Sequence, residues 1–536
     1  MRRLLRHAGI AGSLALALAA PLTPAMARDH RAPTPAEAGP RQAQRQPNVL
    51  FIIADDLAPR LGTYGAPVQT PNIDRLASQG VQFDRAYTQF PWCGPSRASF
   101  LTGTRPDTTR VTDLATPFRR ALPDIQTLPQ YFRTNGYFTA RTGKIFHQGV
   151  PNDIGTSGPD DPQSWDMVVN PRGRDKDDEE AGRLKNNTPG IPYGSAMAWL
   201  DDEGADGDQT DGKVAETAID LLRANAHGDK PFFIAVGFYR PHVPMVAPKK
   251  YFDLYPPESV KIADETPESL ARVPSYTKAW TPDNFGMSAA EQREMVRAYY
   301  ASTSYMDAQV GRVLDELKRL GLDDNTIVVF TGDHGYLLGE HGQWMKNVLW
   351  DQSAHVPLIV RAPGVTKAKS RSPRTVEMLD IYPTLTDLAG LPHYARNEGK
   401  SLVPLLKKPT AKWDHPAYTQ VRGGRTIRTE RWRYTEWEQG QLGAELYDHV
   451  ADPEEHNNLA GDPRFAKVVA SLKQRLPRSA PEKVTRPPNY DKARECLVLP
   501  KGALAAAAIT HSAPGSSPPK GGEGLSGLKA CEELDP

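Results

Sequence analysis

The segment from Cys93 to Gly103 joins a single cysteine to a turn that can begin a helix. It reads Cys93-Gly94-Pro95-Ser96-Arg97-Ala98-Ser99-Phe100-Leu101-Thr102-Gly103. Pro95 suits the first turn of a helix and Gly103 suits its end, so Cys93 is expected just ahead of a short helix whose N-terminus favours anions. An isolated cysteine is usually a small buried hydrophobe. In this setting it is instead a candidate nucleophile.

Acidic residues follow two apolar runs that are typical of buried parallel strands. These runs and the residues after them are Asn48–Ala54 with Asp55 and Asp56, and Thr326–Phe330 with Asp333 and His334. Because polar sites collect beyond the carboxyl ends of parallel strands, we expect these side chains to meet. Carboxylate oxygens are the hard ligands that Ca²⁺ and Mg²⁺ prefer, so the pattern indicates a divalent metal site. One Asp pair alone would indicate only a turn.

Taken together, these residues resemble the formylglycine-dependent sulfatase family, whose signature is C-x-P-S-R followed by T-G. In that family a maturation enzyme oxidises the motif cysteine to formylglycine, an aldehyde whose hydrate is the nucleophile. The resemblance therefore implies formylglycine at Cys93, and it implies a maturation enzyme as a partner. It also implies a metal, Ca²⁺ rather than Mg²⁺, with the ligands Asp55, Asp56, Cys93, Asp333 and His334.

Three further motifs match the family, and their order along the chain outweighs the ordinary expectation that a lone His or Lys is solvated. They are Thr142–His147, Pro241–Pro244 and Gly339–Lys346. The resemblance implies that Lys144 and Lys346 contact the sulfate and that His147 bonds the formylglycine hydrate. It also implies that His242 protonates the leaving alcohol and that Arg97 holds the nucleophile and nearby carboxylates.

The resemblance spans Asn48 to Leu459 and is closest to the iduronate-2-sulfatase branch, whose pattern includes Arg105-Pro106-Asp107-Thr108-Thr109-Arg110-Val111. It implies a sulfated carbohydrate substrate, specifically a 2-O-sulfated uronate, and a sugar-binding wall that contains Arg110, Asp113 and Tyr336. Two alternatives on the same fold stay open, a phosphonate monoester or phosphodiester hydrolase and a choline-sulfatase-like enzyme. A non-catalytic carbohydrate-binding protein is the alternative from another class.

Strands and helices alternate along the chain, which predicts an α/β fold with a doubly wound, mostly parallel sheet; the resemblance makes it alkaline-phosphatase-like. Helices are expected to begin near Thr70, Thr127, Asp211 and Ser288, and Pro231–Phe238 is expected to be another buried strand. Short aromatic and β-branched runs in residues 417–448 predict a small antiparallel sheet. Residues 151–210 are predicted to be a long insertion, either lining the pocket or forming plain surface.

We predict five segments: a signal peptide (1–27), a disordered lead-in (28–46), a catalytic domain (47–390), a C-terminal subdomain (391–500) and a low-complexity tail (501–536). The apolar run Ala8–Ala20 is shorter than the ~20 residues that span a bilayer, so a periplasmic or secreted enzyme without a membrane span is expected. The chain holds 65 Lys and Arg against 64 Asp and Glu, which argues against nucleic acid as a partner. Cys496 and Cys531 are a possible disulfide pair.

Overall fold

The computed structural model describes residues 46–478, 490–491, 496–499, 523–524 and 528–532. The predicted signal peptide and all but the last residue of the predicted lead-in lie outside these residues. Among the helices that the structure describes, none is both long and apolar enough to cross a membrane.

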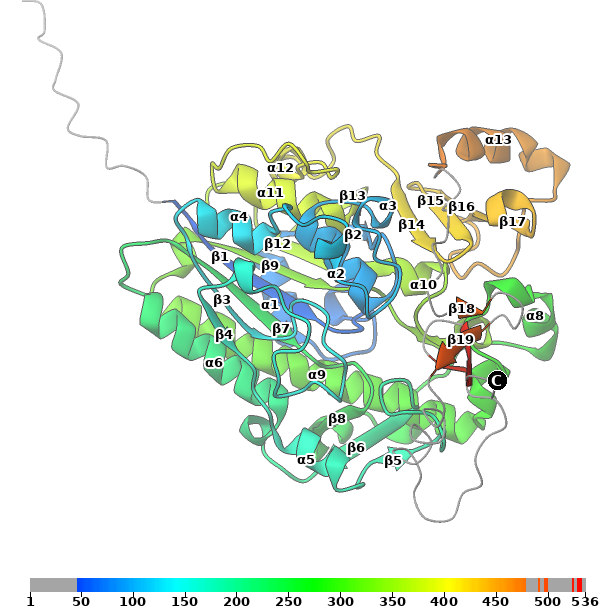
Figure 1. Ribbon diagram of the computed structural model, residues 1–536, viewed down its shortest axis with the longest axis horizontal. Coiled ribbons are helices and arrows are strands. Elements are labelled where there is room, and N and C mark those ends of the chain that lie inside the picture. Colours follow the sequence, from blue (N-terminus) through cyan, green and yellow to red (C-terminus); the bar gives the residue numbers. More distant parts are fainter. Residues whose placement is uncertain (1–45, 479–489, 492–495, 500–522, 525–527, 533–536) are drawn as a thin grey trace, which may run out of the picture. The chain divides into compact units, whose positions relative to one another are not determined.

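A sheet of eight strands forms the centre of the protein (Figure 1). In spatial order its strands are β13 (Ser370–Glu377), β2 (Val81–Tyr87), β12 (His355–Arg361), β9 (Thr326–Gly332), β1 (Asn48–Ala54), β7 (Phe232–Phe238), β3 (Phe138–Gly143) and β4 (Met167–Val169). Strand β12 runs antiparallel to both of its neighbours, and the other neighbouring strands pair in parallel. The predicted mostly parallel α/β fold is therefore confirmed.

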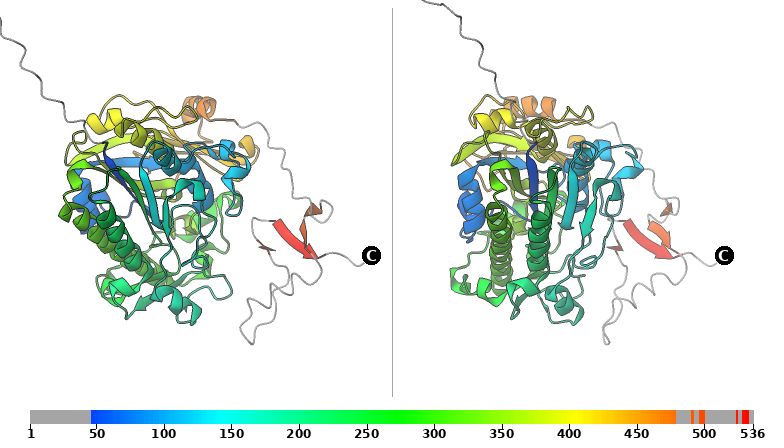
Figure 2. Two further views of the ribbon diagram at one scale, coloured as in Figure 1. Left: turned by 60° about the vertical axis from the view of Figure 1, so that its left-hand side comes forward. Right: turned by 90° about the vertical axis from the view of Figure 1, so that its left-hand side faces the viewer.

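Helices cover both faces of the sheet, so each central strand is buried on both sides (Figure 2). Along β1, Val49, Phe51 and Ile53 pack toward one face, while Leu50, Ile52 and Ala54 pack toward the other. The first face is covered by α2 (Cys93–Thr102), α4 (Leu128–Thr134) and α11 (Ile381–Leu388), and the second by α1 (Pro71–Gln79), α6 (Thr210–Asn225) and α9 (Ala289–Arg319). The continuous apolar run of β1 is the sequence signature of this burial.

Local signals account for where two of these helices begin. The Thr127 side chain accepts a hydrogen bond from the Gln130 amide, and Ser288 and Glu291 form the predicted capping box of α9. At α1 the expected cap is absent, because the Thr70 hydroxyl accepts a hydrogen bond from Gly62 N and donates one to Asp74. The helix begins there with Pro71 at its first position and Asp74 in its first turn as its local signals.

Residues 151–210, predicted as an insertion, contain short elements of their own. They hold β4, α5 (Arg174–Glu180), β5 (Lys185–Asn186) and β6 (Ala198–Asp202), and β5 and β6 form a three-stranded sheet with β8 (Met245–Pro248). The remaining short elements are α3 (Pro106–Thr109), α7 (Lys249–Phe252), α8 (Pro267–Arg272), β10 (Leu337–Leu338), β11 (Trp344–Met345), α10 (Asp351–Ala354) and α12 (Val403–Lys407).

A four-stranded antiparallel sheet follows, as predicted. Its strands are β14 (Ala417–Val421), β15 (Gly424–Arg428), β16 (Trp432–Trp437) and β17 (Gly443–Asp448), and α13 (Ala466–Arg475) packs on them through Leu472. Leu402, Leu405 and Leu406 belong to the core of the main sheet instead. The core of the main sheet therefore includes residues beyond 390, while the predicted boundary itself stays a prediction.

Four short strands occur near the C-terminus, in the order β18 (Tyr490–Asp491), β19 (Cys496–Leu499), β21 (Leu528–Glu532) and β20 (Glu523–Gly524). Two of them lie within the segment predicted as a low-complexity tail. In the parallel pairing of β19 with β21, Cys496 is opposite Lys529 and Cys531 is opposite Val498. The side chains of both cysteines lie outside the described part, so their disulfide stays a prediction.

Candidate active site

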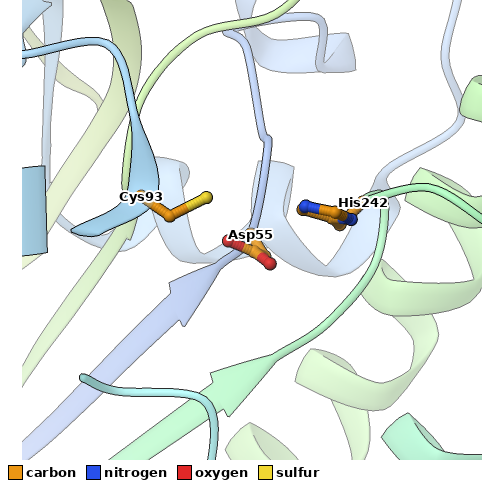
Figure 3. A group of neighbouring side chains, drawn as sticks. All are labelled: Asp55, Cys93 and His242. Atoms are coloured by element: carbon orange, nitrogen blue, oxygen red, sulfur yellow. The ribbon is translucent and has the colours of Figure 1, made fainter. Parts of the chain in front are cut away.

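The predicted catalytic and metal-binding residues converge at the carboxyl ends of the central strands. Asp55 and Asp56 follow β1, Asp333 follows β9, and Lys144 follows β3. Figure 3 shows Cys93 at the start of α2, Asp55 at the end of β1 and His242 on the loop after β7 grouped around one point; one ligand atom from each lies within 4.8 Å of the others. Parallel strands produce this convergence because their polar ends share one edge of the sheet.

Two glycines let β3 and β7 end in close contact beneath the site. Gly143 has φ +69°, which favours glycine, and a Cβ on Gly237 would lie 2.0 Å from the Lys144 carbonyl oxygen. The Lys144 amide donates to the Gly237 carbonyl at 3.0 Å. This close approach fixes the backbone from which the Lys144 side chain extends.

Three carboxylates form the centre of the site. One oxygen from each of Asp55, Asp56 and Asp333 lies within 4.8 Å of the others, and all three side chains are fully buried. The Asp56 amide donates to Asp333 Oδ1 at 3.0 Å, which joins the ends of β1 and β9. Asp56 Oδ2 is buried and has no hydrogen-bond partner within the described chain. Such an orphaned carboxylate oxygen among hard oxygen donors fits a divalent cation.

Arg97 holds the carboxylates in place from α2. Its Nε donates to Asp333 Oδ2 at 2.9 Å and one terminal nitrogen donates to Asp55 Oδ1 at 3.0 Å. The other terminal nitrogen donates to the carbonyls of Lys144 and Ile145 at 2.8 and 2.9 Å. Since the guanidinium is fully buried and these bonds are internal, Arg97 braces the carboxylates at the ends of β1 and β9. That it does not contact substrate stays a prediction.

Two lysines complete the charge balance. Lys144 Nζ donates to Asp55 Oδ2 at 2.6 Å, and Lys346 Nζ forms an ion pair with Asp56 Oδ1. With Arg97 they set three cations against the three carboxylates. A bound divalent ion would therefore make the group positive, which favours an anionic ligand.

Cys93 begins α2 within this group, and its side chain is 2% exposed. Its Sγ lies 3.2 Å from His334 Nε2 and 4.0 Å from Asp56 Oδ1. Burial raises the pKa of the Cys93 thiol, but the charges of Lys144, Lys346 and His334 outweigh burial and hold that pKa well below its usual range. The structure thus gives Cys93 the electropositive surroundings of a reactive cysteine.

Backbone carbonyls fix the rings of His334 and His242. His334 Nδ1 lies 2.9 Å from the Gly335 carbonyl oxygen, and His242 Nδ1 contacts the Val243 carbonyl oxygen. In each ring Nε2 is therefore the atom that faces the site, 3.4 Å (His334) and 3.8 Å (His242) from Asp56. A backbone bond at Nδ1 is the usual way in which a protein orients a metal-binding or proton-transferring histidine.

Burial and neighbouring charges shift the pKa values of Asp333 and His334. Burial raises the pKa of Asp333 to about 7, although the charges of His334 and Arg97 oppose this. Burial lowers the pKa of His334, but Asp333 and Cys93 outweigh it and raise that pKa to about 9. A cation that coordinates His334 must therefore displace a proton.

The comparisons with known proteins agree with this chemistry. A family model described as Sulfatase matches residues 47–391, and one described as N-sulphoglucosamine sulphohydrolase, C-terminal, matches residues 339–482. A protein named Sulfatase from Formosa agariphila is 34% identical, covering 82% of this chain and 88% of its own length. The iduronate 2-sulfatase of Mus musculus is 32% identical, with 80% and 93% covered. The chain belongs to the sulfatase family. It is a sulfuric ester hydrolase.

The fold is shared more widely than this activity. The structure of a phosphonate monoester hydrolase from Silicibacter pomeroyi aligns with a TM-score of 0.65 at 24% identity, covering 80% of this sulfatase and 94% of that chain. At that identity the likeness concerns the fold alone. The relatives above 30% identity described here carry sulfatase names instead, so a phosphonate hydrolase is not favoured.

The residues predicted to bind the sugar lie in different surroundings. Arg110 is exposed at the end of α3, and Asp113 accepts bonds from the amides of Ala115 and Thr116 in its own turn. A Cβ on Gly94 would lie 2.8 Å from the Asp113 carbonyl oxygen, so this turn borders the Cys93 helix. The Tyr336 ring is instead fully buried against Tyr299, with ring centroids 5.2 Å apart. Burial does not decide the predicted role of Tyr336, because Lys144 and Asp55 are equally buried, so its contact with the sugar stays a prediction.

Two residues that shape the sulfatase site were not predicted to be site residues. The Tyr299 hydroxyl donates to the Asp56 carbonyl at 2.9 Å, across 243 residues of chain. The Ser96 hydroxyl donates to the Asp333 carbonyl oxygen. Ser96 belongs to the C-x-P-S-R signature, so the sequence offered a signal that could have identified it. Tyr299 lies within the long helix α9, where no motif marks it.

Proposed function

We propose that this protein is an exported sulfatase that removes a sulfate ester from a sulfated sugar, a 2-O-sulfated uronate, using a formylglycine made from Cys93. The observation that carries the proposal is the position of Cys93 beside three carboxylates and three fixed cations. A sulfate ester repels a nucleophile until its oxygens are neutralised, and this arrangement supplies the neutralising charge.

A calcium ion fits this donor set better than magnesium. Asp55, Asp56 and Asp333 offer several carboxylate oxygens, with His334 Nε2 beside them, and Mg²⁺ prefers fewer protein ligands and more water. When bound, the ion supplies positive charge that polarises the sulfate oxygens. The buried Oδ2 of Asp56, which has no hydrogen-bond partner in the described part of the chain, is the atom that most needs such a ligand.

Formylglycine at position 93 supplies, once hydrated, a hydroxyl nucleophile. The chain itself supports this role through the charges of Lys144 and Lys346, which favour an anion at position 93. His147 contributes a hydrogen bond to the same side chain. Because Cys93 is 2% exposed, a maturation enzyme has to reach it before the domain closes.

The remaining site residues bind the substrate or transfer a proton. Lys144 and Lys346 can exchange a carboxylate contact for a sulfate oxygen once a cation neutralises the carboxylates. His242 Nε2 is held toward the site by the bond at its Nδ1, as needed to give a proton to the leaving alcohol. Arg110, exposed beside the Cys93 helix, suits a bidentate grip on the uronate carboxylate.

Kinetics on paired substrates test this proposal. The enzyme should hydrolyse an aryl sulfate far faster than the matching aryl phosphate; the reverse preference would indicate a phosphoester hydrolase. Binding of sulfated sugar without turnover would indicate a carbohydrate-binding protein, and selectivity for choline sulfate would indicate that branch of the family.

The sugar is tested with Arg110→Ala. This change should lower kcat/KM for a 2-O-sulfated uronate at least tenfold, about the strength of one charge-assisted hydrogen bond, and leave a small aryl sulfate nearly unaffected. Arg120→Ala, at another exposed arginine, is the control and should change neither. Equal losses on both substrates for Arg110→Ala would indicate that Arg110 only braces its loop.

A further inference from the structure

We propose that Tyr299 is a positioning residue that fixes Asp56 for metal binding. The inference rests on the proposed function, because it concerns the same metal site. Tyr299 touches neither substrate nor the reacting atoms; it acts through the backbone of Asp56.

The Tyr299 hydroxyl closes the turn that follows β1. It donates to the Asp56 carbonyl oxygen at 2.9 Å and accepts from the Ala58 amide at 3.0 Å. No side chain within the turn makes either bond. One hydroxyl therefore satisfies two buried backbone groups that would otherwise lack partners.

The backbone at Asp56 needs this support. Its φ is +64°, in the left-handed region that non-glycine residues rarely adopt. The amide of Asp56 is held on the other side by Asp333 Oδ1 at 3.0 Å. Hydrogen bonds from outside the turn therefore hold both the amide and the carbonyl of the strained residue Asp56. Such support of a strained residue indicates a functional role rather than a packing role.

The conformation places the Asp56 carboxylate at the centre of the site. Its Oδ1 pairs with Lys346 and lies 3.4 Å from His334 Nε2, while its Oδ2 is buried and has no hydrogen-bond partner among the residues that the structure describes. Relaxation of the backbone would turn these oxygens away from the other carboxylates. The affinity for the metal should therefore fall, since hard cations require several oxygens at fixed distances.

Tyr299 is itself rigidly held. It is fully buried on α9, a helix of 31 residues packed against the sheet, and its ring stacks on Tyr336. The Tyr299 hydroxyl therefore links α9, which packs on one face of the sheet, to the turn that bears Asp56. A phenylalanine would preserve the ring packing and remove only the two hydrogen bonds.

The experiment compares Tyr299→Phe with Tyr64→Phe. The Tyr64 hydroxyl makes the same pair of contacts, donating to the Phe83 carbonyl at 3.0 Å and accepting from the Leu358 amide at 3.0 Å, but these belong to β2 and β12. For both variants and wild type we would measure the melting temperature, the calcium affinity by titration calorimetry without substrate, and aryl sulfatase kinetics as a function of calcium.

Both variants should lose similar thermal stability, but only Tyr299→Phe should bind calcium more weakly, by about 3- to 10-fold, the loss expected for one or two hydrogen bonds. Excess calcium should restore most of its kcat with KM unchanged. Equal calcium affinity in wild type and Tyr299→Phe would overturn the inference and leave the sulfatase proposal standing.

The two proposals fail in different ways. If the wild-type protein binds calcium but hydrolyses no sulfate ester, the proposed function is refuted. The difference in calcium affinity between wild type and Tyr299→Phe would still test the role of Tyr299. Wild type that binds no divalent ion would refute the inference directly. If Tyr299→Phe does not fold, Tyr299→Met removes the same hydroxyl with an adaptable apolar side chain and must show the same weaker binding.

Discussion

Arg97→Ala should damage the stability of this protein more than almost any other change at the site. The substitution removes a fully buried guanidinium that bonds Asp55 and Asp333 and two backbone carbonyls. Leaving buried charge without its partner costs about 3–5 kcal/mol. Each orphaned carbonyl adds about 1 kcal/mol or more. The expected loss is therefore about 5–7 kcal/mol, much of the usual stability of a domain.

Scanning calorimetry measures this effect. In a protein of this size the unfolding entropy of about 2.1 cal/mol/K per residue makes each kcal/mol worth about 1 °C, so the melting temperature should fall by about 5–7 °C. Calcium should recover part of the loss, because the variant site carries one more uncompensated negative charge.

Arg133→Ala is the matched control. Arg133 also pairs with an aspartate, Asp166, and bonds a carbonyl, but the two side chains are 39% and 32% exposed. An exposed pair contributes about 0–1 kcal/mol, so its melting temperature should change by no more than about 1 °C. Equal small shifts in both variants would refute the view that Arg97 braces the carboxylates.

Two further changes test separate parts of the account. Asp333→Ala should abolish calcium retention and activity together, because Asp333 also bonds the Asp56 amide and Arg97; full metal occupancy by elemental analysis would remove Asp333 from the site. Tyr336→Phe deletes a buried hydroxyl that lacks a partner within the described chain, so unfolding free energy should stay equal or rise by up to about 1 kcal/mol with KM unchanged. A raised KM for sulfated sugar would instead support the predicted place of Tyr336 in the sugar-binding wall.

Three of the parallel strands, β1, β7 and β9, and the residues after them could be predicted because burial on both faces leaves a plain sequence signal. Strand β1 has the predicted bounds, and Asp55 and Asp56 meet Asp333 because parallel strands place their carboxyl ends together. Strand β12 could not be predicted. Pro357 lies within it, and proline argues against a central strand; the structure accommodates it at a shift in register between Val356 and Leu358.

Residues that act across long stretches of chain also escaped prediction. Tyr299 has no local pattern that marks it, since its partners lie 241 and 243 residues away. The resemblance implies that Tyr336 lies in the sugar-binding wall, but only the placement of α9 shows that its ring stacks on Tyr299. Sequence spacing indicates which residues share a loop, whereas the direction of each side chain depends on the elements packed against it.

The most direct test of the account is a mass spectrum of the peptide that contains Cys93, taken from active enzyme produced with a sulfatase-maturing partner. The account predicts that an aldehyde replaces the thiol-bearing side chain and that the modified fraction rises in proportion to specific activity. Cys93→Ala, prepared in parallel, should fold with wild-type secondary structure and lose turnover by several orders of magnitude. Full activity in a preparation that holds only unmodified cysteine at position 93 would contradict the account.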